Sequence, residues 1–350
     1  MNSEWQTFLE QQGATIADGE VRNYGDHQAE LKQAVEGDSL CDLSHEGLIM
    51  ARGEESTGFL QGQLTNDVRA VSETRHQLSS YCSPKGRMLS LFRLFMRDEA
   101  YCLQLPAALL EPTLKRLKMF VLMSKVELED VSDRLVRFSL AGPSAETLLK
   151  THLGAAPASE GEAMTHEGIT ALRIAGSQPR FILHGEPEAM QRLWQALQND
   201  GATPVGAEAG RLLDIHAGLP AVYPETVEAF VPQMVNLQLI DGVSFKKGCY
   251  TGQEVVARMQ YLGKLKRRMY LAHVETAEAP QPGAELRSPH SASGQGAGKV
   301  VSAAASPKGG YDLLCVCEIA AAESGEVTLD DAPVSLREPP YGFESEQAVG

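Results

Sequence analysis

The chain has 350 residues, of which 43% are apolar and 22% are charged. Single hydrophobic cores rarely grow past roughly 250 residues, so this length predicts two or three domains, and the composition excludes a largely disordered protein. The formal net charge of -15 argues against a protein that coats nucleic acid by neutralising phosphates, so such binding would require a local basic patch.

The beginning of the sequence, MNSEWQTFLEQQG, lacks the basic start and apolar centre of a signal peptide. No apolar run approaches the ~18 residues of a membrane span. The cysteines form no CxxC pair, which argues against both a disulfide framework and a thiolate metal cage. We therefore predict a cytoplasmic protein with reduced thiols at Cys41, Cys82, Cys102, Cys249, Cys315 and Cys317.

The first elements can be predicted from apolar spacing and from turn residues. Residues 3–12 have the pattern of an amphipathic helix with Ser3 as its N-cap, and residues 47–53 that of a strand. Apolar residues at helical spacing follow this strand and continue as far as a polar corner at residues 65–67. Two alternating apolar runs flank Ser-Pro-Lys-Gly at 83–86 and predict a β-hairpin, which a third run at 100–106 extends. An apolar helical stripe begins at Leu110.

The order of elements then repeats. From Arg137 we expect a strand, a helix, two strands and a second helix, which suggests two related α+β lobes. After Ala277 short strands separated by Gly and Pro indicate a small all-β domain. We therefore place a first lobe with the N-terminal helix at 1–135, a second lobe at 136–263, the β domain at 264–342 and a frayed tail at 343–350.

The sequence KKGCYTGQE at 246–254 places Cys249 between glycines and behind two lysines. Thr251 and Glu254 have capping-box spacing, which predicts a helix over 252–262 that stops at Gly263. The positive helix end and the lysines would then favour a thiolate, and the glycines would let a ligand approach the backbone. The alternative is a small buried residue in a tight turn. We favour a functional thiol.

Arg258, Lys264, Lys266, Arg267 and Arg268 form either an anion-binding face or a solvated helix end followed by an edge strand. Cys315 and Cys317 share one face of a strand, but two ligands alone make a poor metal site. We expect no metal site.

The region FVPQMVNLQLIDGVSFKKGCYTGQEVVARMQYLGKLKRR resembles the signature of the YgfZ-type folate-binding family, the tRNA-modifying proteins, which are related to the aminomethyltransferase (T-protein) of glycine cleavage. CDLSHEGLIMARG, FLQGQLTNDV and SPKGRMLSLFRLF resemble the family's first lobe, and the segment from KVVSAAAS to REPPYGF resembles its terminal barrel. The resemblance covers nearly the whole chain. It implies an aminomethyltransferase-like α+β fold of three domains, with a C-terminal β-barrel and a central opening for folate.

The resemblance also implies a function. The family supports the assembly or repair of iron-sulfur clusters in selected enzymes, including those that methylthiolate tRNA. The implied cofactor is tetrahydrofolate or a derivative, and the implied partners are iron-sulfur client enzymes or assembly proteins. An iron-sulfur cluster would be involved only transiently, tRNA would not be bound tightly, and no membrane is involved. The motif residues carried over are Cys249 as functional thiol, with Lys247, Gly248, Tyr250, Gly252, Gln253, Glu254 and Arg258.

Two departures from the superfamily bear on activity. Aminomethyltransferases carry an acidic pair near the position of residues 88–91, where this chain has Met-Leu-Ser-Leu, so the group needed for proton transfer is missing. His216 stands where the superfamily has a pterin-binding Glu, and imidazole offers one donor and one acceptor in place of two acceptors. The candidate folate-binding residues are Asp67, Lys85, Arg87 and His216.

Three hypotheses therefore remain. The chain is a folate-linked iron-sulfur maintenance protein with Cys249 as its thiol, a non-catalytic folate-binding scaffold, or a one-carbon transferase that uses Asp67 or His216 as base. Whether it is an enzyme stays open. The basic cluster, if functional, would bind folate glutamates or RNA phosphate.

Overall fold

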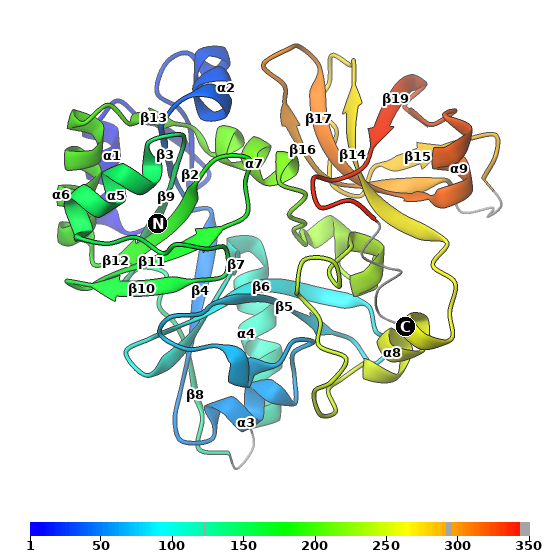
Figure 1. Cartoon of the computed structure of the whole chain (residues 1–350), viewed down its shortest axis with the longest axis horizontal. Coiled ribbons are helices and arrows are strands. Elements are labelled where there is room, and N and C mark those ends of the chain that lie inside the picture. The colour runs from blue at the N-terminus through cyan, green and yellow to red at the C-terminus, as the bar shows by residue number, and fades with distance from the viewer. Residues whose placement is uncertain (122–123, 292–295, 344–350) are drawn as a thin grey trace. The chain divides into compact units, whose positions relative to one another are not determined.

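The computed structural model describes residues 1–121, 124–291 and 296–343 (Figure 1). The chain forms two compact units. The first holds Met1–Phe59, Arg69–Gln77 and Phe92–Leu213, and the second holds Leu60–Val68, Leu78–Leu91 and the chain from Asp214 onward. Mixed sheets, helices and a closed barrel confirm the predicted α+β class. The three-domain boundaries stay a prediction, and residues 344–350 of the predicted tail lie outside the described residues.

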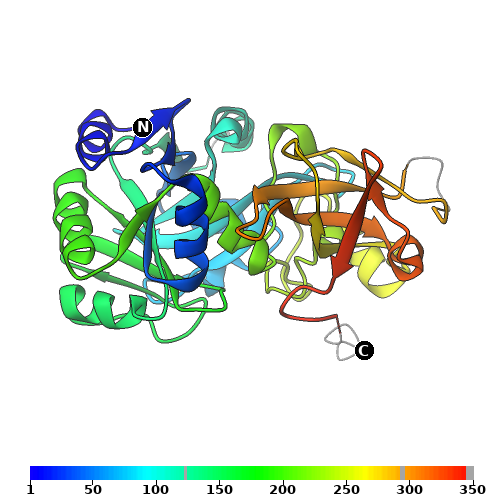
Figure 2. The same cartoon turned by 90° about the horizontal axis from the view of Figure 1, so that it is seen from above.

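A six-stranded sheet in the first unit has the order β10-β11-β12-β9-β3-β13. Its strands are β3 (Ser39–Asp42), β9 (Val136–Ala141), β10 (Ala163–His166), β11 (Ile169–Ile174), β12 (Arg180–Gly185) and β13 (Thr203–Val205). The helices α1 (Ser3–Gln11), α5 (Ala145–Leu153) and α6 (Pro187–Asn199) lie beside this sheet (Figure 2), and their buried side chains share one hydrophobic core with it. The strand, helix, two strands and helix predicted from Arg137 are present as β9, α5, β11, β12 and α6, but the structure adds a further strand, β10, between α5 and β11.

The N-terminal helix α1 packs on β9 and α6, which lie more than a hundred residues later in the chain. Trp5 is fully buried and stacks on Phe138 of β9, with a ring-centroid distance of 6.1 Å, and meets Trp194 of α6 edge-on at 5.7 Å. Aromatic burial decides where the helix packs, because each ring buries a large apolar area. The N-cap is Asn2 in place of the predicted Ser3, since the Asn2 side chain accepts a hydrogen bond from Trp5 N at 3.0 Å.

A five-stranded sheet has the order β5-β6-β7-β4-β8. Its strands are β4 (Glu46–Arg52), β5 (Gln77–Cys82), β6 (Met88–Arg97), β7 (Ala100–Pro106) and β8 (Glu127–Asp130). The hairpin predicted around residues 83–86 is therefore confirmed as β5 and β6. The helix α4 (Ala107–Val121) packs on β4, where Gly47 leaves room for Leu110.

The second unit contains a closed barrel of order β14-β17-β16-β15-β18-β19. Its strands are β14 (Arg267–Val274), β15 (Glu285–Arg287), β16 (Gly298–Ala305), β17 (Tyr311–Glu318), β18 (Thr328–Leu329) and β19 (Ala332–Arg337). Arg267 and Arg268 pair with β17, whereas the pairing of β14 with β19 begins only at Leu271, so the first residues of β14 have a strand on one side, as the edge-strand alternative expected. Cys315 and Cys317 lie in the barrel core, and burial raises the pKa of both thiols, that of Cys317 to about 11.

Shorter elements connect these sheets. They are β1 (Thr15–Ala17), β2 (Glu20–Asn23), α2 (His27–Glu36), α3 (Ser56–Gln61), η1 (Val68–Ala70), α7 (Ala207–His216), η2 (Pro224–Thr226), η3 (Pro232–Val235), α8 (Gln253–Tyr261) and α9 (Ile319–Ser324). The cysteine motif at 246–254 adjoins two of them, because Lys247 donates to the carbonyl oxygen of Gln61 at the end of α3 and α8 begins at Gln253.

A buried histidine gives the first unit an expected sensitivity to acid. His76 is 4% exposed, and its Nε2 lies 2.8 Å from the carbonyl oxygen of Arg173. Burial, followed by the charge of Arg93, lowers the pKa of His76 to about 3. An unfolded histidine has a pKa of about 6.5, so between these values the unfolded chain binds the extra proton and acid favours unfolding.

We expect His76 to reduce the free energy of unfolding by about 1.4 kcal/mol for each pH unit between roughly pH 6 and pH 4. His76→Gln keeps a donor for the Arg173 carbonyl but cannot titrate, so its unfolding free energy should fall less steeply with acid. Urea denaturation of wild type and His76→Gln at several pH values gives, for each protein, the slope of the unfolding free energy against pH. Equal slopes would show that His76 does not contribute to acid sensitivity.

Candidate functional site

The cysteine motif precedes α8, but the helix begins differently from the prediction. Its first residue is Gln253, and its N-cap is Gly252, which has a left-handed backbone with φ of 84° and forms no side-chain cap. The predicted capping box of Thr251 and Glu254 is therefore wrong, and the helix ends at Tyr261. A left-handed turn favours glycine, so backbone geometry defines the helix start here.

Gly252 and the hairpin turn at residues 83–86 are in close contact. A Cβ atom on Gly252 would lie 2.5 Å from the carbonyl oxygen of Ser83 and 2.9 Å from Cα of Gly86. Gly86 also has positive φ, and a Cβ there would lie 2.8 Å from Cβ of Val255 in α8. Two glycine turns from distant parts of the sequence thus fit together where side chains would prevent it.

Lys247 anchors the other end of the motif. It is 6% exposed, and its Nζ donates to the carbonyl oxygens of Gln61 at 2.7 Å, Asn66 at 3.1 Å and Leu64. The ammonium also lies 5.0 Å from the centroid of the Tyr250 ring, a cation–π distance. Because Gln61 ends α3, the Lys247 charge also complements the negative end of that helix.

Cys249 lies between these two anchors and is exposed, whereas the other five cysteines of the chain, all within the described residues, are buried. The interpretation of Cys249 as a small buried residue is therefore wrong. Gly248 and Lys246 are exposed beside it, and Tyr250 is buried, which raises the pKa of its hydroxyl. A Cβ on Gly248 would meet nothing within 4 Å, so that glycine is not required by local packing. The arrangement presents one thiol to solvent on a fixed backbone.

The remaining motif residues lie on α8. The backbone N–H of Gln253 donates to the carbonyl oxygen of Tyr250 at 3.2 Å and so closes the turn. Glu254 is exposed in the first turn of the helix, where a carboxylate is favourable, and Arg258 is exposed in its last turn. Both side chains are accessible to a ligand or partner.

The polar corner at residues 65–67 supports the segment that leads into the motif. Asn66 Nδ2 donates to the carbonyl oxygens of Leu78 and Asp241, and the Thr65 hydroxyl donates to that of Gly242 at 2.9 Å. Asp67 is half-buried and accepts a hydrogen bond from Gln61 Nε2 at 3.0 Å. The carbonyl of Asn66 in this corner is also one of the three partners of Lys247, a role that the Thr-Asn-Asp spacing alone did not reveal.

His216, at the end of α7, is held by the barrel. Its Nε2 lies 2.7 Å from Asp312 Oδ2, and the other oxygen of Asp312 lies 2.8 Å from Nδ1 of His273. Burial would raise the pKa of Asp312, but the hydrogen bonds to the two histidines hold it below its ordinary value. The hydrogen bond to Asp312 raises the pKa of His273. One nitrogen of His216 is therefore occupied by a carboxylate of the same chain.

Lys85 lies in the hairpin turn at residues 83–86, and Arg87 directly follows that turn. Lys85 is exposed, whereas the Arg87 guanidinium donates to the carbonyl oxygens of Glu228 at 3.2 Å and Ala229 at 2.7 Å. Met88 and Ser90 are buried, and the stretch at 88–91 supplies no carboxylate. Arg87 also lines a pocket of about 790 Å³.

The comparisons place this fold among known proteins. A family model described as the GCVT N-terminal domain matches residues 20–247. The solved structure of the glycine cleavage system aminomethyltransferase T from Bartonella henselae is 17% identical in sequence, has a TM-score of 0.76, and aligns over 97% of this chain and 98% of that one. The chain therefore has the aminomethyltransferase-like fold that the sequence predicted, and is of the GCVT domain class.

Curated relatives narrow the class. The tRNA-modifying protein YgfZ of Colwellia psychrerythraea is 38% identical over 232 residues, which cover 66% of this chain and 70% of the relative. That of Photorhabdus laumondii is 35% identical over 71% of this chain and 74% of the relative. The chain belongs to the YgfZ family. In the part of the chain that the structure describes, no helix combines the length and apolarity needed to cross a bilayer.

Proposed function

We propose that the chain binds a tetrahydrofolate derivative and supports the assembly or repair of iron-sulfur clusters in selected enzymes, so that its effect on tRNA modification is indirect. Relatives bear the name tRNA-modifying protein, which supports the link to tRNA. The net charge of -15 favours an indirect effect, because an acidic chain gains little from phosphate contacts.

The exposed thiol of Cys249 is the observation that carries this proposal. Lys247 fixes the backbone before it, and the close contact of Gly252 with the hairpin turn fixes the backbone after it. A thiolate at this position is a soft ligand for iron and a nucleophile for sulfur, and its access to solvent lets a client protein reach it. A single exposed thiol suits a transient contact with a cluster better than permanent four-ligand binding.

The candidate folate residues fit a folate only in part. Asp67 is a half-buried carboxylate that can accept N–H groups of a pterin, and Lys85 is an exposed cation that can pair with glutamate carboxylates. His216 fits poorly, because Asp312 already occupies its Nε2. In this proposal Asp67 would orient the pterin and Lys85 would bind the glutamate end, while the bound folate supplies one-carbon or redox chemistry.

The same residues rank the two alternative functions, a folate-binding scaffold and an aminomethyltransferase. A non-catalytic folate-binding scaffold would not require an exposed thiol. An aminomethyltransferase would require a titratable group near residues 88–91, where Met88 and Ser90 are buried and no carboxylate is present. The scaffold is therefore the second candidate, and one-carbon transfer with Asp67 or His216 as base is the third.

The test is complementation with Cys249→Ala. In cells that lack their own copy, wild type should restore methylthiolated tRNA bases and the activity of a second iron-sulfur enzyme, whereas Cys249→Ala should restore less than about a tenth of either. Because Cys249 is exposed, the variant should keep its thermal stability within about 0.5 kcal/mol. Gly248→Ala, next to the thiol and in open space, is the matched control and should rescue like wild type.

Each other outcome selects a different hypothesis. Equal rescue by Cys249→Ala and wild type would refute the thiol role and favour the scaffold. Failure of wild type to rescue either readout would refute iron-sulfur maintenance as the function.

A further inference from the structure

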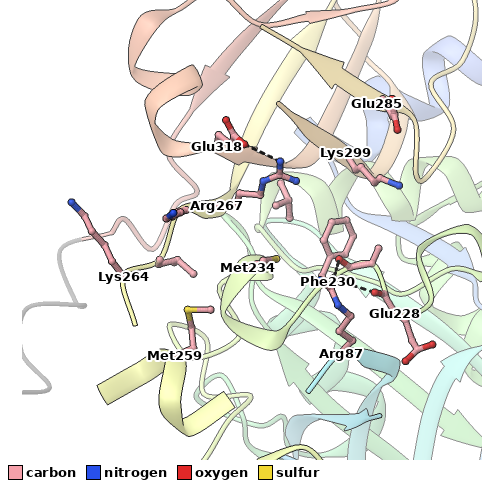
Figure 3. Close-up of a pocket in the computed structure, with 14 residues that line it drawn as sticks. Arg87, Glu228, Phe230, Met234, Met259, Lys264, Arg267, Glu285, Lys299 and Glu318 are labelled. Carbon is pink, nitrogen blue, oxygen red and sulfur yellow. Dashed lines mark hydrogen bonds and ion pairs between the residues drawn. The ribbon is translucent and has the colours of Figure 1, made fainter. Parts of the chain in front are cut away.

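A pocket of about 790 Å³ lies within the second unit, where the turn of η3, the end of α8 and the strands β14, β16 and β17 supply its lining (Figure 3). Its size is in the range of small-molecule sites. Of the candidate folate residues, Arg87 lines it, whereas Asp67, Lys85 and His216 do not, and neither does Cys249. The pocket is therefore distinct from the cysteine motif and shares only Arg87 with the candidate folate residues.

The charges of this pocket are unbalanced. Arg87, Lys264, Lys266, Arg267 and Lys299 are among the residues that line it, together with Glu228, Glu285 and Glu318. In a chain of net charge -15 this local excess of positive charge is unusual.

Ion pairing removes only part of that excess. Arg267 is paired with Glu318 at 2.9 Å. Within the described residues, the ammonium groups of Lys264, Lys266 and Lys299 have no hydrogen-bond or ion-pair partner, even though Glu285 stands opposite Lys299 in the strand register. Like charges gathered around one pocket repel each other, and a bound anion removes that cost.

The rest of the lining is apolar. Phe230 and Val316 are buried, and Met234, Met259 and Leu265 are half-buried, so they leave apolar surface open to a ligand. Methionine side chains adapt to ligands of irregular shape. An apolar lining with a few charged groups is the usual composition of a site for an amphipathic small molecule.

We propose that this pocket binds a small molecule that carries carboxylate or phosphate groups beside an apolar or aromatic part. Arg87 and the three unpaired lysines recognise the anionic groups, and Phe230, Met234 and Met259 contact the apolar part. An oligoglutamyl chain and a nucleoside phosphate both have this chemistry. The proposal depends neither on the reactivity of Cys249 nor on a pterin site.

Calorimetric titration of the full chain at low salt distinguishes the two candidate ligands, an oligoglutamyl chain and a nucleoside phosphate. One probe is p-aminobenzoyl-pentaglutamate, which has the glutamates without the pterin, and the other is guanosine triphosphate. The test variant is Lys264→Gln/Lys266→Gln/Lys299→Gln. Its control is Lys115→Gln/Lys118→Gln/Lys308→Gln, which removes the same charge from exposed lysines that do not line the pocket.

We expect wild type and the control to bind at least one probe with similar affinity, and the test variant to bind it at least about tenfold more weakly, since each lysine removed deletes a direct charge contact. The probe that binds identifies the source of the ligand. Equal loss of affinity in both triple variants would overturn the proposal by showing a general charge effect. Absence of binding of either probe to wild type at millimolar concentration would also overturn it.

Discussion

Lys247→Met is expected to lower the free energy of unfolding by about 3 kcal/mol, because it leaves buried carbonyl oxygens without their donor. The carbonyls of Gln61, Leu64 and Asn66 share the single ammonium group. Methionine fills a similar volume and remains apolar, so the loss reports on these hydrogen bonds and not on a cavity.

Lys246→Met is the matched control. Lys246 is the preceding residue but is exposed, so its replacement should change the unfolding free energy by no more than about 0.5 kcal/mol. Urea denaturation of the two variants and wild type gives the comparison through the transition midpoints. If both variants unfolded at the same urea concentration, Lys247 would not be the anchor of the motif.

Gly252→Ala is expected to destabilise the chain by about 3 kcal/mol, which combines a left-handed backbone unfavourable for alanine with a steric clash. The new Cβ would lie 2.5 Å from the Ser83 carbonyl oxygen and 2.9 Å from Cα of Gly86. Both neighbours are backbone atoms, so relief requires movement of the hairpin turn or of α8. The variant should therefore also displace Cys249 and reduce rescue of tRNA methylthiolation.

Gly248→Ala provides the comparison within the same motif. Its backbone is outside the left-handed region and a Cβ there meets nothing within 4 Å, so alanine should be tolerated within about 0.5 kcal/mol. Thermal and urea unfolding of both variants measure the difference. A Gly252→Ala protein as stable as Gly248→Ala would mean that the two turns separate readily and that the thiol is not rigidly held.

The regular elements were largely predictable because their signals are local. Alternating apolar residues predicted β6 and β7, and helical spacing predicted α5 and α6, since each element buries one side against a sheet. The start of α8 was not predictable in the same way. The capping-box pattern of Thr251 and Glu254 is a local signal, but contact with a turn more than a hundred residues earlier forces Gly252 into the left-handed conformation that defines the helix start.

Packing over long sequence distances also decided where α1 lies. The sequence predicted the helix, but its neighbours Phe138 and Trp194 are far away along the chain and were not identifiable as the partners of Trp5. The position of His216 likewise depends on a contact that is distant in sequence, because its partner Asp312 lies on a barrel strand.

The sequence by itself determined the α+β class, most element positions, the family resemblance and the choice of the KGCYTGQE motif as the candidate site, because these depend on residue type and spacing along the chain. Tertiary structure alone decided that Cys249 is exposed, that Lys247 is buried against three carbonyls, and that lysines far apart in sequence line one pocket. Burial and charge pairing depend on which distant residues become neighbours, and local sequence patterns do not encode that information.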